Sequence, residues 1–351
     1  MENQIFICGN FGYRSNQLDG QTIKTRVLKE EIGNRINTDI VYTDTSFIKK
    51  NPFSVLRNVY INFKRSSHII IMPDSNAFKV LLPFYILLNK KRKDIRYVVI
   101  GGWLPGFLEK SKFYRFLCTK INGIYVEANE MKERMQKIGL ENTKILPNFR
   151  EFKYKAKAEK QIGSPMKLVY FSRVLKEKGV ELAIQAVNEI NRNKVHVKLD
   201  IIGPINEEYK LYFQKIIGEQ GEDIKYKGFL EPNEIHEVLS KYDAMIFPTY
   251  FESEGFPGAV IDAYIAGLPV LASDWKYNKE FVIDQYTGII FKVKDVEDII
   301  LKIKYLLANP EIVLSLRENC INQAFKYHVN SVFPELIRDM GLESNSKYQS
   351  K

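Results

Sequence analysis

The sequence predicts an α/β protein made of two doubly wound domains, each with a parallel β-sheet. The chain has 351 residues, whereas a single hydrophobic core usually stops growing at about 250–300 residues. Short apolar runs alternate with longer segments of helical periodicity, which is typical of parallel sheets covered by helices on both faces. The alternation is interrupted at Pro147 and Asn148 and then starts again. These three observations favour two such domains in succession.

Five apolar runs in the first half predict strands that are buried on both faces. They are Gln4–Cys8, Ile40–Tyr42, His68–Met72, Tyr97–Ile100 and Gly123–Val126. Helical segments fall between them, at Thr22–Arg35 and Ala77–Lys90. The charged stretch Lys153–Gly163 indicates a linker. We therefore expect a first domain over residues 1–155.

The second half repeats the pattern and predicts a domain over residues 163–328. Its expected strands are Leu168–Ser172, Val197–Ile202, Ile224–Phe229, Ala244–Phe247, Pro269–Ser273 and Gly288–Phe291. Its expected helices are Gly179–Ile190, Glu207–Gly218, Asn233–Lys241, Gly258–Ala266 and Val296–Leu307. Residues 329–351 are expected to form a helix that returns to the first domain. Open parallel sheets bind ligands at the carboxyl ends of their strands, so two domains facing each other would enclose a cleft.

Composition narrows the class of protein. The chain is 45% hydrophobic and 27% charged, as in ordinary globular proteins. Cys8, Cys118 and Cys320 have no paired spacing, which argues against a disulfide framework and favours a reducing compartment. The N-terminus does not resemble a signal peptide, and no apolar run approaches the roughly 18–20 residues that span a bilayer. We therefore expect a cytoplasmic protein.

The net charge of +10 is distributed unevenly. Residues 1–150 contain 25 Lys or Arg and 13 Asp or Glu, a balance of +12, while the remaining 201 residues contain 27 and 29, a balance of −2. Nucleic acid, an anionic membrane surface, a pyrophosphate-linked ligand or mere solvation could explain the excess. Val80–Lys93 (VLLPFYILLNKKRK) and Leu108–Lys120 (LEKSKFYRFLCTK) combine cations with apolar residues. Such stretches suit an anionic membrane surface, or a core helix with a solvated end.

The most informative segment is Pro248–Asp274, PTYFESEGFPGAVIDAYIAGLPVLASD, which predicts a strand, a loop, a helix, a tight turn and a strand. Pro257 suits the first turn of a helix, because its missing N–H would be unpaired there anyway. Gly267 suits the helix end, and Pro269 prevents the helix from continuing. The backbone N–H groups of residues 256–259 and the helix dipole would then form a phosphate site.

Two carboxylates accompany this helix. Glu254 precedes it, and Asp262 lies one turn inside it. Glu254 can lie at the mouth of the cleft, whereas Asp262 can accept hydrogen bonds from a vicinal diol such as a ribose. An acidic N-cap followed by a solvated helix face would explain the same residues.

A second segment, Tyr170–Gly179 (YFSRVLKEKG), places two cations after a predicted strand. Arg173 and Lys178 could bind a diphosphate, the first through its planar fork and the second as a point charge. A departing diphosphate gains negative charge, and loss of one fixed donor to such charge typically costs roughly 10²–10³ in rate. Alone, the segment is equally explained by a surface cluster that includes Glu177.

Together the two segments resemble glycosyltransferase family 4, a family of retaining enzymes with the GT-B fold of two Rossmann-like domains. That family pairs a strand-end Arg and a following Lys with two carboxylates separated by seven residues. The matching residues here are Arg173, Lys178, Glu254 and Asp262, where Asp262 replaces the usual Glu and is one methylene shorter. The resemblance implies retaining transfer from a nucleotide-diphosphate sugar. Glu254 would orient the sugar, while Arg173, Lys178 and the helix amides would stabilise the leaving diphosphate.

The resemblance implies further donor-binding residues. Gly228–Leu230 matches the region near the nucleotide base, Gly203 lies at a strand end near the donor, and Gly20 and Gln21 open a helix beneath the diphosphate. The expected set is Gly20, Gln21, Gly203, Phe229, Leu230, Gly255, Phe256, Pro257, Gly258 and Asp262. Judged from its residues alone, the loop Cys8–Thr25 lacks the spacing of a dinucleotide fingerprint, and a flexible acceptor loop is the alternative.

Gly102 and Trp103 are expected on the acceptor side. They lie in Ile100–Gly106 (IGGWLPG), where many members of the family have a His. Glycine permits close backbone approach, and Trp103 either stacks on a sugar or packs in the core. The histidines form no cluster in the sequence: His68, His196, His236 and His328. We therefore expect no catalytic histidine, and, because Asp-x-Asp is absent, no metal or other cofactor.

The sequence thus predicts a hexosyltransferase-type enzyme for surface polysaccharide synthesis, acting on a saccharide or lipid-linked saccharide at the inner face of the cell membrane. A nucleotide-sugar epimerase with a GT-B-like fold and a non-catalytic GT-B scaffold are the alternatives. An epimerase needs acid and base groups around the sugar, and no such group of residues is evident. Nucleic-acid binding would leave the donor motif unexplained, so we expect none.

Overall fold

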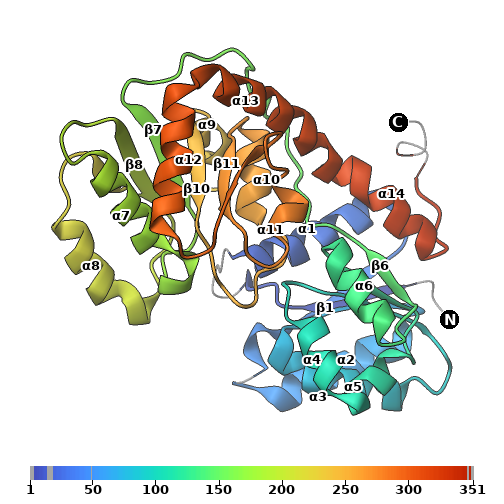
Figure 1. The fold of residues 1–351 in the computed structure, drawn as a ribbon. Coiled ribbons are helices and arrows are strands. Elements are labelled where there is room, and N and C mark those ends of the chain that lie inside the picture. The colour runs from blue at the N-terminus through green and yellow to red at the C-terminus, as the bar shows by residue number, and fades with distance from the viewer. Residues whose placement is uncertain (1–3, 14–18, 49, 346–347, 349–351) are drawn as a thin grey trace. The chain divides into compact units, whose positions relative to one another are not determined.

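The computed structural model describes residues 4–13, 19–48, 50–345 and 348. The chain divides into two compact units, one of residues 1–151 and 328–351 and one of residues 152–327 (Figure 1). Each unit contains its own six-stranded sheet, and all the strand pairs are parallel. This is the α/β class that the sequence predicts. Within the described residues, no helix combines the length and the apolar character needed to cross a membrane.

The sheet of the first unit has the strand order β2-β1-β3-β4-β5-β6. Its strands are β1 (Ile5–Gly9), β2 (Ile40–Asp44), β3 (His68–Met72), β4 (Asp94–Val98), β5 (Gly123–Val126) and β6 (Thr143–Ile145). β4 begins at Asp94 rather than at the predicted Tyr97. The apolar pattern does not reveal its first residues, because Asp94 and Arg96 are charged and form an ion pair. β6 has no counterpart among the predicted strands, since it is three residues long and Lys144 is exposed.

Helices cover both faces of the first sheet. They are α1 (Gly20–Arg35), α2 (Pro52–Arg65), α3 (Ser75–Leu88), α4 (Leu104–Lys110), α5 (Lys112–Cys118), α6 (Asn129–Lys137) and α14 (Val329–Asp339). α14 packs against α1, and the buried ring of Phe333 lies 4.9 Å from that of Phe149. The guanidinium of Arg35 also donates to Asn330 at 2.6 Å. The last helix is therefore part of the first unit, although it follows the second unit in sequence.

The sheet of the second unit has the strand order β12-β11-β10-β7-β8-β9. Its strands are β7 (Met166–Phe171), β8 (Val197–Ile202), β9 (Ile224–Tyr226), β10 (Ala244–Phe247), β11 (Val270–Ser273) and β12 (Gly288–Phe291). Its helices are α7 (Val180–Ile190), α8 (Lys210–Gly218), α9 (Ile235–Leu239), α10 (Gly258–Ile265), α11 (Asn278–Phe281), α12 (Val296–Ala308) and α13 (Pro310–Ala324). β9 ends before the predicted Phe229, because the chain turns at Gly228, which has a φ of +79°.

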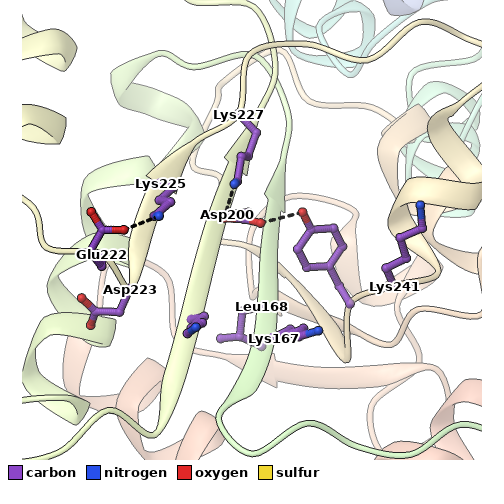
Figure 2. Close-up of a pocket in the computed structure, with 10 residues that line it drawn as sticks. Lys167, Leu168, Asp200, Glu222, Asp223, Lys225, Lys227 and Lys241 are labelled. Atoms are coloured by element: carbon purple, nitrogen blue, oxygen red, sulfur yellow. Dashed lines mark hydrogen bonds and ion pairs between the residues drawn. The ribbon is translucent and has the colours of Figure 1, made fainter.

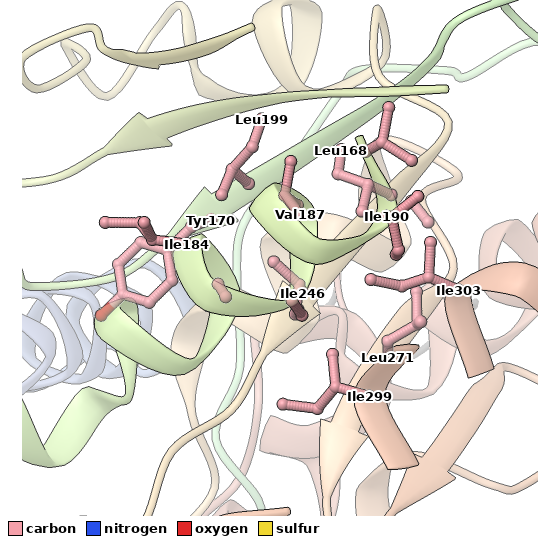
Figure 3. Close-up of a cluster of buried hydrophobic side chains, with 14 of the residues drawn as sticks. Leu168, Tyr170, Ile184, Val187, Ile190, Leu199, Ile246, Leu271, Ile299 and Ile303 are labelled. Carbon is pink, nitrogen blue, oxygen red and sulfur yellow. The ribbon is translucent and has the colours of Figure 1, made fainter. Parts of the chain in front are cut away.

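One face of the second sheet packs against α7 and α12 (Figure 3). Leu168 and Tyr170 of β7 belong to this cluster, together with Ile184 and Val187 of α7 and Ile303 of α12. Ile184 and Val187 are three residues apart, so they lie on one face of the helix. Fully burying each such aliphatic side chain contributes about 1.5–3 kcal/mol. This packing anchors β7, whose carboxyl end leads into the candidate site.

Parallel strands bring their carboxyl ends to one edge of a sheet. In the second unit, the loops after β7, β8, β9 and β10 leave from this edge and carry Arg173, Gly203, Gly228 and Glu254. In the first unit, the loops after β1 and β4 lead into the segments that contain Gly20 and Gly102. The topology of each sheet therefore gathers residues that are far apart in the sequence.

Candidate active site

The helix that follows Glu254 begins at Gly258, the residue that the sequence predicts. Pro257 is the N-cap of α10, with a ψ of 124°, and Gly258 is the first helical residue. Pro257 therefore ends the loop instead of occupying the first turn. Gly258 and Ala259 are partly exposed, and the first N–H groups of a helix have no partner within it. These amides form the positive end of an eight-residue helix.

A Schellman motif ends α10. Gly267 has a φ of +66°, and its N–H donates to the carbonyl of Tyr264 at 2.9 Å. The N–H of Leu268 donates to the carbonyl of Ala263 at 2.8 Å. Both hydrogen bonds of the motif are present, so Gly267 stops the helix for the reason that the sequence indicates.

The side chain of Phe256 points into the core of the second unit. Its ring stacks on that of Phe281, with centroids 3.8 Å apart and planes inclined by 2°, and meets the ring of Tyr327 at 4.7 Å. Phe256 is only 3% exposed, and the neighbouring Gly255 and Pro257 are also buried. Phe256 thus anchors the loop, and only its backbone can take part in a site.

Glu254 and Lys178, to which the sequence assigns separate roles, form a buried ion pair. Nζ of Lys178 lies 2.5 Å from Oε2 of Glu254, and each residue is 6% exposed. The hydroxyl of Thr249 donates to the same carboxylate oxygen at 2.8 Å. Burial lowers the pKa of Lys178, while the charge of Glu254 opposes this shift. A desolvated cation and anion therefore lie together at the carboxyl edge of the sheet.

A close backbone contact brings this ion pair together. Gly179 has a φ of +75°, and a Cβ at this position would lie 2.1 Å from the carbonyl oxygen of Pro248. The N–H of Tyr250 donates to the carbonyl of Glu177 at 2.7 Å. The turn after β7 and the exit from β10 are therefore joined, and Gly179 is a position that only glycine can occupy without strain.

Arg173 lies near the ion pair and is exposed. Its guanidinium carbon is 5.5 Å from the centroid of the Phe251 ring, and Nζ of Lys178 is 5.0 Å from the same centroid. The ring attracts both cations through its quadrupole. Burial is the main cause of the lowered pKa of Lys178, and the positive charge of Arg173 lowers it further. Arg173 is thus open to an anion from solvent, whereas Lys178 already has a partner.

Asp262 contacts a histidine that the sequence analysis leaves without a role. Oδ1 of Asp262 lies 3.2 Å from Nε2 of His236 in α9, and Asp262 is 6% exposed. The ring of His236 is also 6.1 Å from that of Tyr154. His236 therefore has a carboxylate partner that the sequence does not indicate. No sequence signal could have found the contact, since the two residues are joined by the packing of α9 on α10.

The expected base-binding region lies after β8 and β9. Gly203 has a φ of +145°, and a Cβ there would be 1.9 Å from the carbonyl oxygen of Ser172. Its N–H donates to the carbonyl of Gly228 at 2.7 Å. Phe229 is 66% exposed, and Leu230 is half-buried. The two loops are thus bonded together and present an aromatic ring to solvent.

In the first unit, Gly20 and Gln21 begin α1. Asp19 caps this helix by accepting the N–H of Thr22 at 2.8 Å, and the Thr22 hydroxyl accepts the N–H of Asp19 at 3.0 Å. Among the described residues, no heavy atom beyond its chain neighbours and the backbone of its own helix lies within 4 Å of a Cβ built on Gly20, so the described packing does not require glycine there. Nε2 of Gln21 is buried and has no hydrogen-bond partner in the described structure. Residues 14–18 of the preceding loop lie outside the described residues.

Trp103 packs in an aromatic cluster of the first unit. Its ring centroid is 5.4 Å from that of Phe78 and 5.8 Å from that of Phe107. This arrangement favours the core-packing alternative for Trp103. Gly101, rather than Gly102, has a positive φ, at +80°. Of the two glycines, Gly101 is therefore the one whose backbone conformation favours glycine.

A second buried ion pair lies at the carboxyl edge of the first sheet. Nζ of Lys24 is 2.6 Å from Oε1 of Glu127, and their side chains are 0% and 2% exposed. Oε2 of Glu127 accepts the N–H of Gly101 at 3.3 Å. The pair therefore ties α1 to the loops after β4 and β5. The sequence does not indicate this ion pair, because Lys24 and Glu127 are 103 positions apart and meet only in the folded unit.

Within the described residues, no three His, Cys, Asp or Glu side chains gather closely enough to coordinate a metal ion. Glu252, which the sequence places nearest to an Asp-x-Asp pattern with Glu254, instead pairs with Lys276. Its side chain is 79% exposed. The two acidic residues therefore lie in different environments.

A hollow of about 320 Å³ lies over β7, β8 and β9 (Figure 2). Its charged lining residues are Lys167, Lys198, Lys225, Lys227, Lys241, Asp200, Glu222 and Asp223. The hydroxyl of Tyr242 donates to Asp200 at 2.8 Å. β9 is an edge strand, and lysines on an edge strand discourage pairing with another sheet. Edge protection therefore explains Lys225, which lies in β9. The predicted site residues do not line this hollow.

Comparison with known proteins gives both family and fold. Residues 152–327 match the family described as glycosyl transferases group 1. One relative is the N,N'-diacetylbacillosaminyl-diphospho-undecaprenol alpha-1,3-N-acetylgalactosaminyltransferase of Campylobacter jejuni, 24% identical over 326 residues, which are 85% of this chain and 84% of the relative. Another is the lipopolysaccharide 1,2-N-acetylglucosaminetransferase of Salmonella typhimurium, 30% identical over 128 residues, about a third of each chain.

Solved structures match nearly the whole chain. HepE of Anabaena in complex with UDP and glucose has a TM-score of 0.69 at 13% identity, with coverage of 97% of this chain and 100% of that chain. Sucrose-phosphate synthase of Thermosynechococcus elongatus has a TM-score of 0.76 at 14% identity, with coverage of 97% and 99%. At these identities the likeness shows the fold, which is GT-B. The family match covers half of the chain. The chain therefore belongs to the glycosyl transferases group 1 family and is a glycosyltransferase with the GT-B fold.

Proposed function

We propose that the enzyme transfers a sugar, with retention of configuration, from a nucleotide diphosphate to a saccharide acceptor, and that the second unit binds the donor. The observation that carries this proposal is the buried Lys178–Glu254 pair, at 2.5 Å, beside the exposed Arg173. Four residues after Glu254, α10 presents its amide end at Gly258. A cation and unpaired N–H groups near one carboxylate suit a ligand that combines hydroxyl groups with phosphates.

Stabilisation of the leaving diphosphate is assigned to three features. Arg173 is exposed and can bind phosphate oxygens through two parallel N–H donors. The N–H groups of Gly258 and Ala259 lie at the positive end of the α10 dipole. Lys178 supplies a third positive group; burial lowers its pKa, and the neighbouring charge of Glu254 opposes this shift. Such preorganised groups cost no reorganisation when charge develops on the leaving oxygen.

Glu254 is proposed to orient the donor sugar. Its Oε2 is bonded to Lys178 and Thr249, so the carboxylate is fixed in position while Oε1 can accept sugar hydroxyls. A carboxylate that is paired in this way is a weak nucleophile, which does not favour a covalent glycosyl intermediate on Glu254. We therefore propose front-face attack, in which the departing phosphate oxygen takes the proton of the acceptor hydroxyl.

Asp262 is proposed to accept hydrogen bonds from the ribose, and Phe229 and Leu230 to contact the base. The exposed ring of Phe229 offers a flat surface for stacking. Gly203 is proposed to lie near the donor, because its lack of a side chain lets the loop after β8 pack against the backbone of Ser172, next to Arg173. HepE, which shares the fold, is described in complex with UDP, so UDP-sugars are the first donors to test.

The first unit is proposed to contribute Gly20 and Gln21 near the donor phosphates and Gly102 near the acceptor. The buried amide nitrogen of Gln21, which has no hydrogen-bond partner among the described residues, supports a polar ligand at the start of α1. The Campylobacter relative acts, by its name, on a diphospho-undecaprenol-linked sugar, and the Salmonella relative on lipopolysaccharide. We therefore propose a lipid-linked saccharide acceptor, surface polysaccharide synthesis and peripheral association with the inner face of the cell membrane. Transfer is proposed to need no metal ion.

The decisive experiment substitutes Glu254→Gln, which preserves the shape of the side chain and removes its charge. Thermal-shift screening of UDP-, GDP- and ADP-sugars identifies the donor, and sugar transfer from that donor to a lipid-linked saccharide is then measured. We expect a loss of at least about 10²-fold in turnover. Glu252→Gln is the matched control, because Glu252 is two residues away and exposed. Near-normal turnover of the Glu254 variant would contradict the assignment.

Two alternatives remain testable with the same reagents. The relatives named above are transferases, which does not favour an epimerase. Incubation with the donor alone separates the two reactions, because an epimerase would produce a new nucleotide sugar without any acceptor. A non-catalytic scaffold would show no rise in melting temperature with any nucleotide sugar.

A further inference from the structure

The first unit exposes large apolar side chains on three helices, α2, α3 and α5. The most exposed are Phe53 (86%), Leu87 (70%), Phe113 (60%), Phe116 (58%) and Val80 (55%). Scattered apolar residues on a surface need no explanation, but a contiguous group marks a site of interaction. Contacts between α3 and α5 show which of these residues form one surface.

α3 has apolar residues on both its inner and its outer face. The inner face packs on the sheet through residues such as Phe78, Leu82 and Tyr85, which are 0% exposed. Val80, Phe84 and Leu87 recur at spacings of four and three, which places them together on the opposite face. A helix that is apolar all round is normally buried, whereas the outer face of α3 is open to solvent.

α5 continues this surface. The hydroxyl of Tyr114 in α5 donates to the carbonyl of Lys79 in α3 at 2.9 Å, and the Tyr114 ring lies 5.9 Å from that of Phe78. The two helices contact each other directly and lie close together at the lower edge of Figure 1. Phe113 and Phe116 are three residues apart, so they share the exposed face of α5. We name Val80, Phe84, Leu87, Phe113 and Phe116 the α3–α5 surface.

Basic residues predominate in the segments that carry the α3–α5 surface and in the preceding α2. Residues 52–93 include eight Lys or Arg and a single acidic residue, Asp74, and residues 112–120 include three Lys or Arg and no acidic residue. Two of these cations serve other purposes. Lys93 donates to the carbonyl of Ser66 at 2.6 Å, and Arg115 donates to the carbonyl of Glu109 at 3.0 Å.

The remaining cations of these segments are exposed: Arg57, Lys64, Arg65, Lys79, Lys90, Lys91, Arg92, Lys112 and Lys120. Lys120 lies 4.7 Å from the centroid of the Phe116 ring, which places a cation directly beside the apolar surface. Apolar side chains that are rimmed by lysine and arginine match a partner with an apolar interior and an anionic boundary.

We propose that the α3–α5 surface docks on an anionic lipid bilayer, with the apolar side chains entering the interface and the surrounding cations contacting lipid headgroups. Phe and Leu side chains insert at this interfacial depth, and basic residues add electrostatic attraction that falls with salt. An acidic protein would satisfy the cations, but it would not explain the bare outer face of α3. The inference rests on the peripheral membrane association proposed above and assigns it a surface, but docking of this kind does not require the donor site.

The test measures sedimentation of the full chain with vesicles. Vesicles of phosphatidylglycerol and phosphatidylcholine should bind the wild type at low salt, and vesicles of phosphatidylcholine alone should bind it less. The triple variant Leu87→Ser, Phe113→Ser and Phe116→Ser should lose about tenfold or more in vesicle affinity. These side chains are already exposed, so the variant should fold, which its thermal unfolding checks.

The matched control removes three exposed apolar side chains from the second unit, Val195→Ser, Leu211→Ser and Leu301→Ser. These residues are 44%, 83% and 63% exposed, and the control should bind vesicles like the wild type. A charge variant, Lys112→Glu with Lys120→Glu, should weaken binding to anionic vesicles and reduce its dependence on salt.

Three results would overturn the proposal. In the first, the wild type fails to bind anionic vesicles at low salt. In the second, the α3–α5 variant and its control bind equally well. In the third, the wild type self-associates through this surface, and the triple variant becomes monomeric with no change in vesicle binding. A thermal shift with UDP, measured on each variant, keeps failure of docking separate from failure of the donor site.

Discussion

Both units bury a Lys–Glu ion pair at the carboxyl edge of their sheet, and the surroundings of the two pairs differ. Lys24 and Glu127 are almost completely enclosed, and the second oxygen of Glu127 is occupied by a backbone N–H. The side chains of Lys178 and Glu254 are 7% and 8% exposed and have the accessible Arg173 as a neighbour. A buried ion pair therefore does not by itself mark an active site. What distinguishes the second pair is access to solvent beside unpaired donors.

The largest effects are expected when the lysine of either pair is removed. Lys178→Ala and Lys24→Ala each leave a buried carboxylate without its cation, which should cost about 3–5 kcal/mol in the free energy of unfolding. Urea unfolding measures this cost. Of the two variants, Lys178→Ala alone should also abolish the thermal shift produced by UDP.

A double variant guards against loss of folding. Lys178→Met with Glu254→Leu replaces both charges by apolar groups of similar volume, which is often close to neutral for stability. It should fold and yet fail to bind UDP. Loss of UDP binding in a folded Lys24 variant would remove the proposed difference between the two pairs.

Substitution of Gly203 in the second unit should destabilise the protein much more than substitution of Gly20 in the first unit. Gly203→Ala places a Cβ 1.9 Å from a carbonyl oxygen at a φ of +145°, so backbone strain and overpacking should cost about 3 kcal/mol or more. Among the described residues beyond its chain neighbours and its own helix, Gly20→Ala meets no atom within 4 Å and should change stability by at most about 1 kcal/mol. Chemical unfolding of both variants checks the contrast, which equal destabilisation would contradict.

His236→Ala tests whether the Asp262 contact matters for the nucleotide. Removal of a hydrogen bond to a charged group costs about 1.5–3 kcal/mol, so UDP affinity should fall by roughly tenfold or more in isothermal titration. His196→Ala is the matched control, because His196 is exposed and should bind UDP normally. If the His236 variant bound UDP with unchanged affinity, the contact between His236 and Asp262 would have no role in nucleotide binding.

The smallest expected effect concerns acid stability in the first unit. Burial opposes ionisation of Asp94, yet hydrogen bonds from His68 and Arg96 lower the pKa of this carboxyl overall. A lowered pKa stabilises the fold above the ordinary pKa of the carboxyl, and this stability is lost as pH falls through the folded-state value. Asp94→Asn should therefore cost about 1 kcal/mol at neutral pH. In urea unfolding, the difference from wild type should shrink as pH falls below 3.8, the ordinary pKa of the carboxyl.

Fold class, enzyme class and the main elements could be predicted from the sequence. The strand runs follow from local apolar periodicity, and the limits of α10 follow from Pro257 and Gly267. These signals act within a few residues of the chain, because a proline restricts its own φ and a left-handed turn favours glycine. The short strand β6 lacked such a signal. The roles of Arg173, Glu254 and Asp262 in transfer stay predictions.

Tertiary structure alone decided which groups meet. Lys178 and Glu254 are 76 positions apart and form an ion pair because β7 and β10 are neighbours in the sheet. The packing of α9 on α10 brings His236 to Asp262, and the aromatic cluster around Phe78 takes in Trp103. Periodicity specifies which face of an element is apolar, but strand order and packing decide which other element covers that face. The chemistry of the site depends on those long-range contacts.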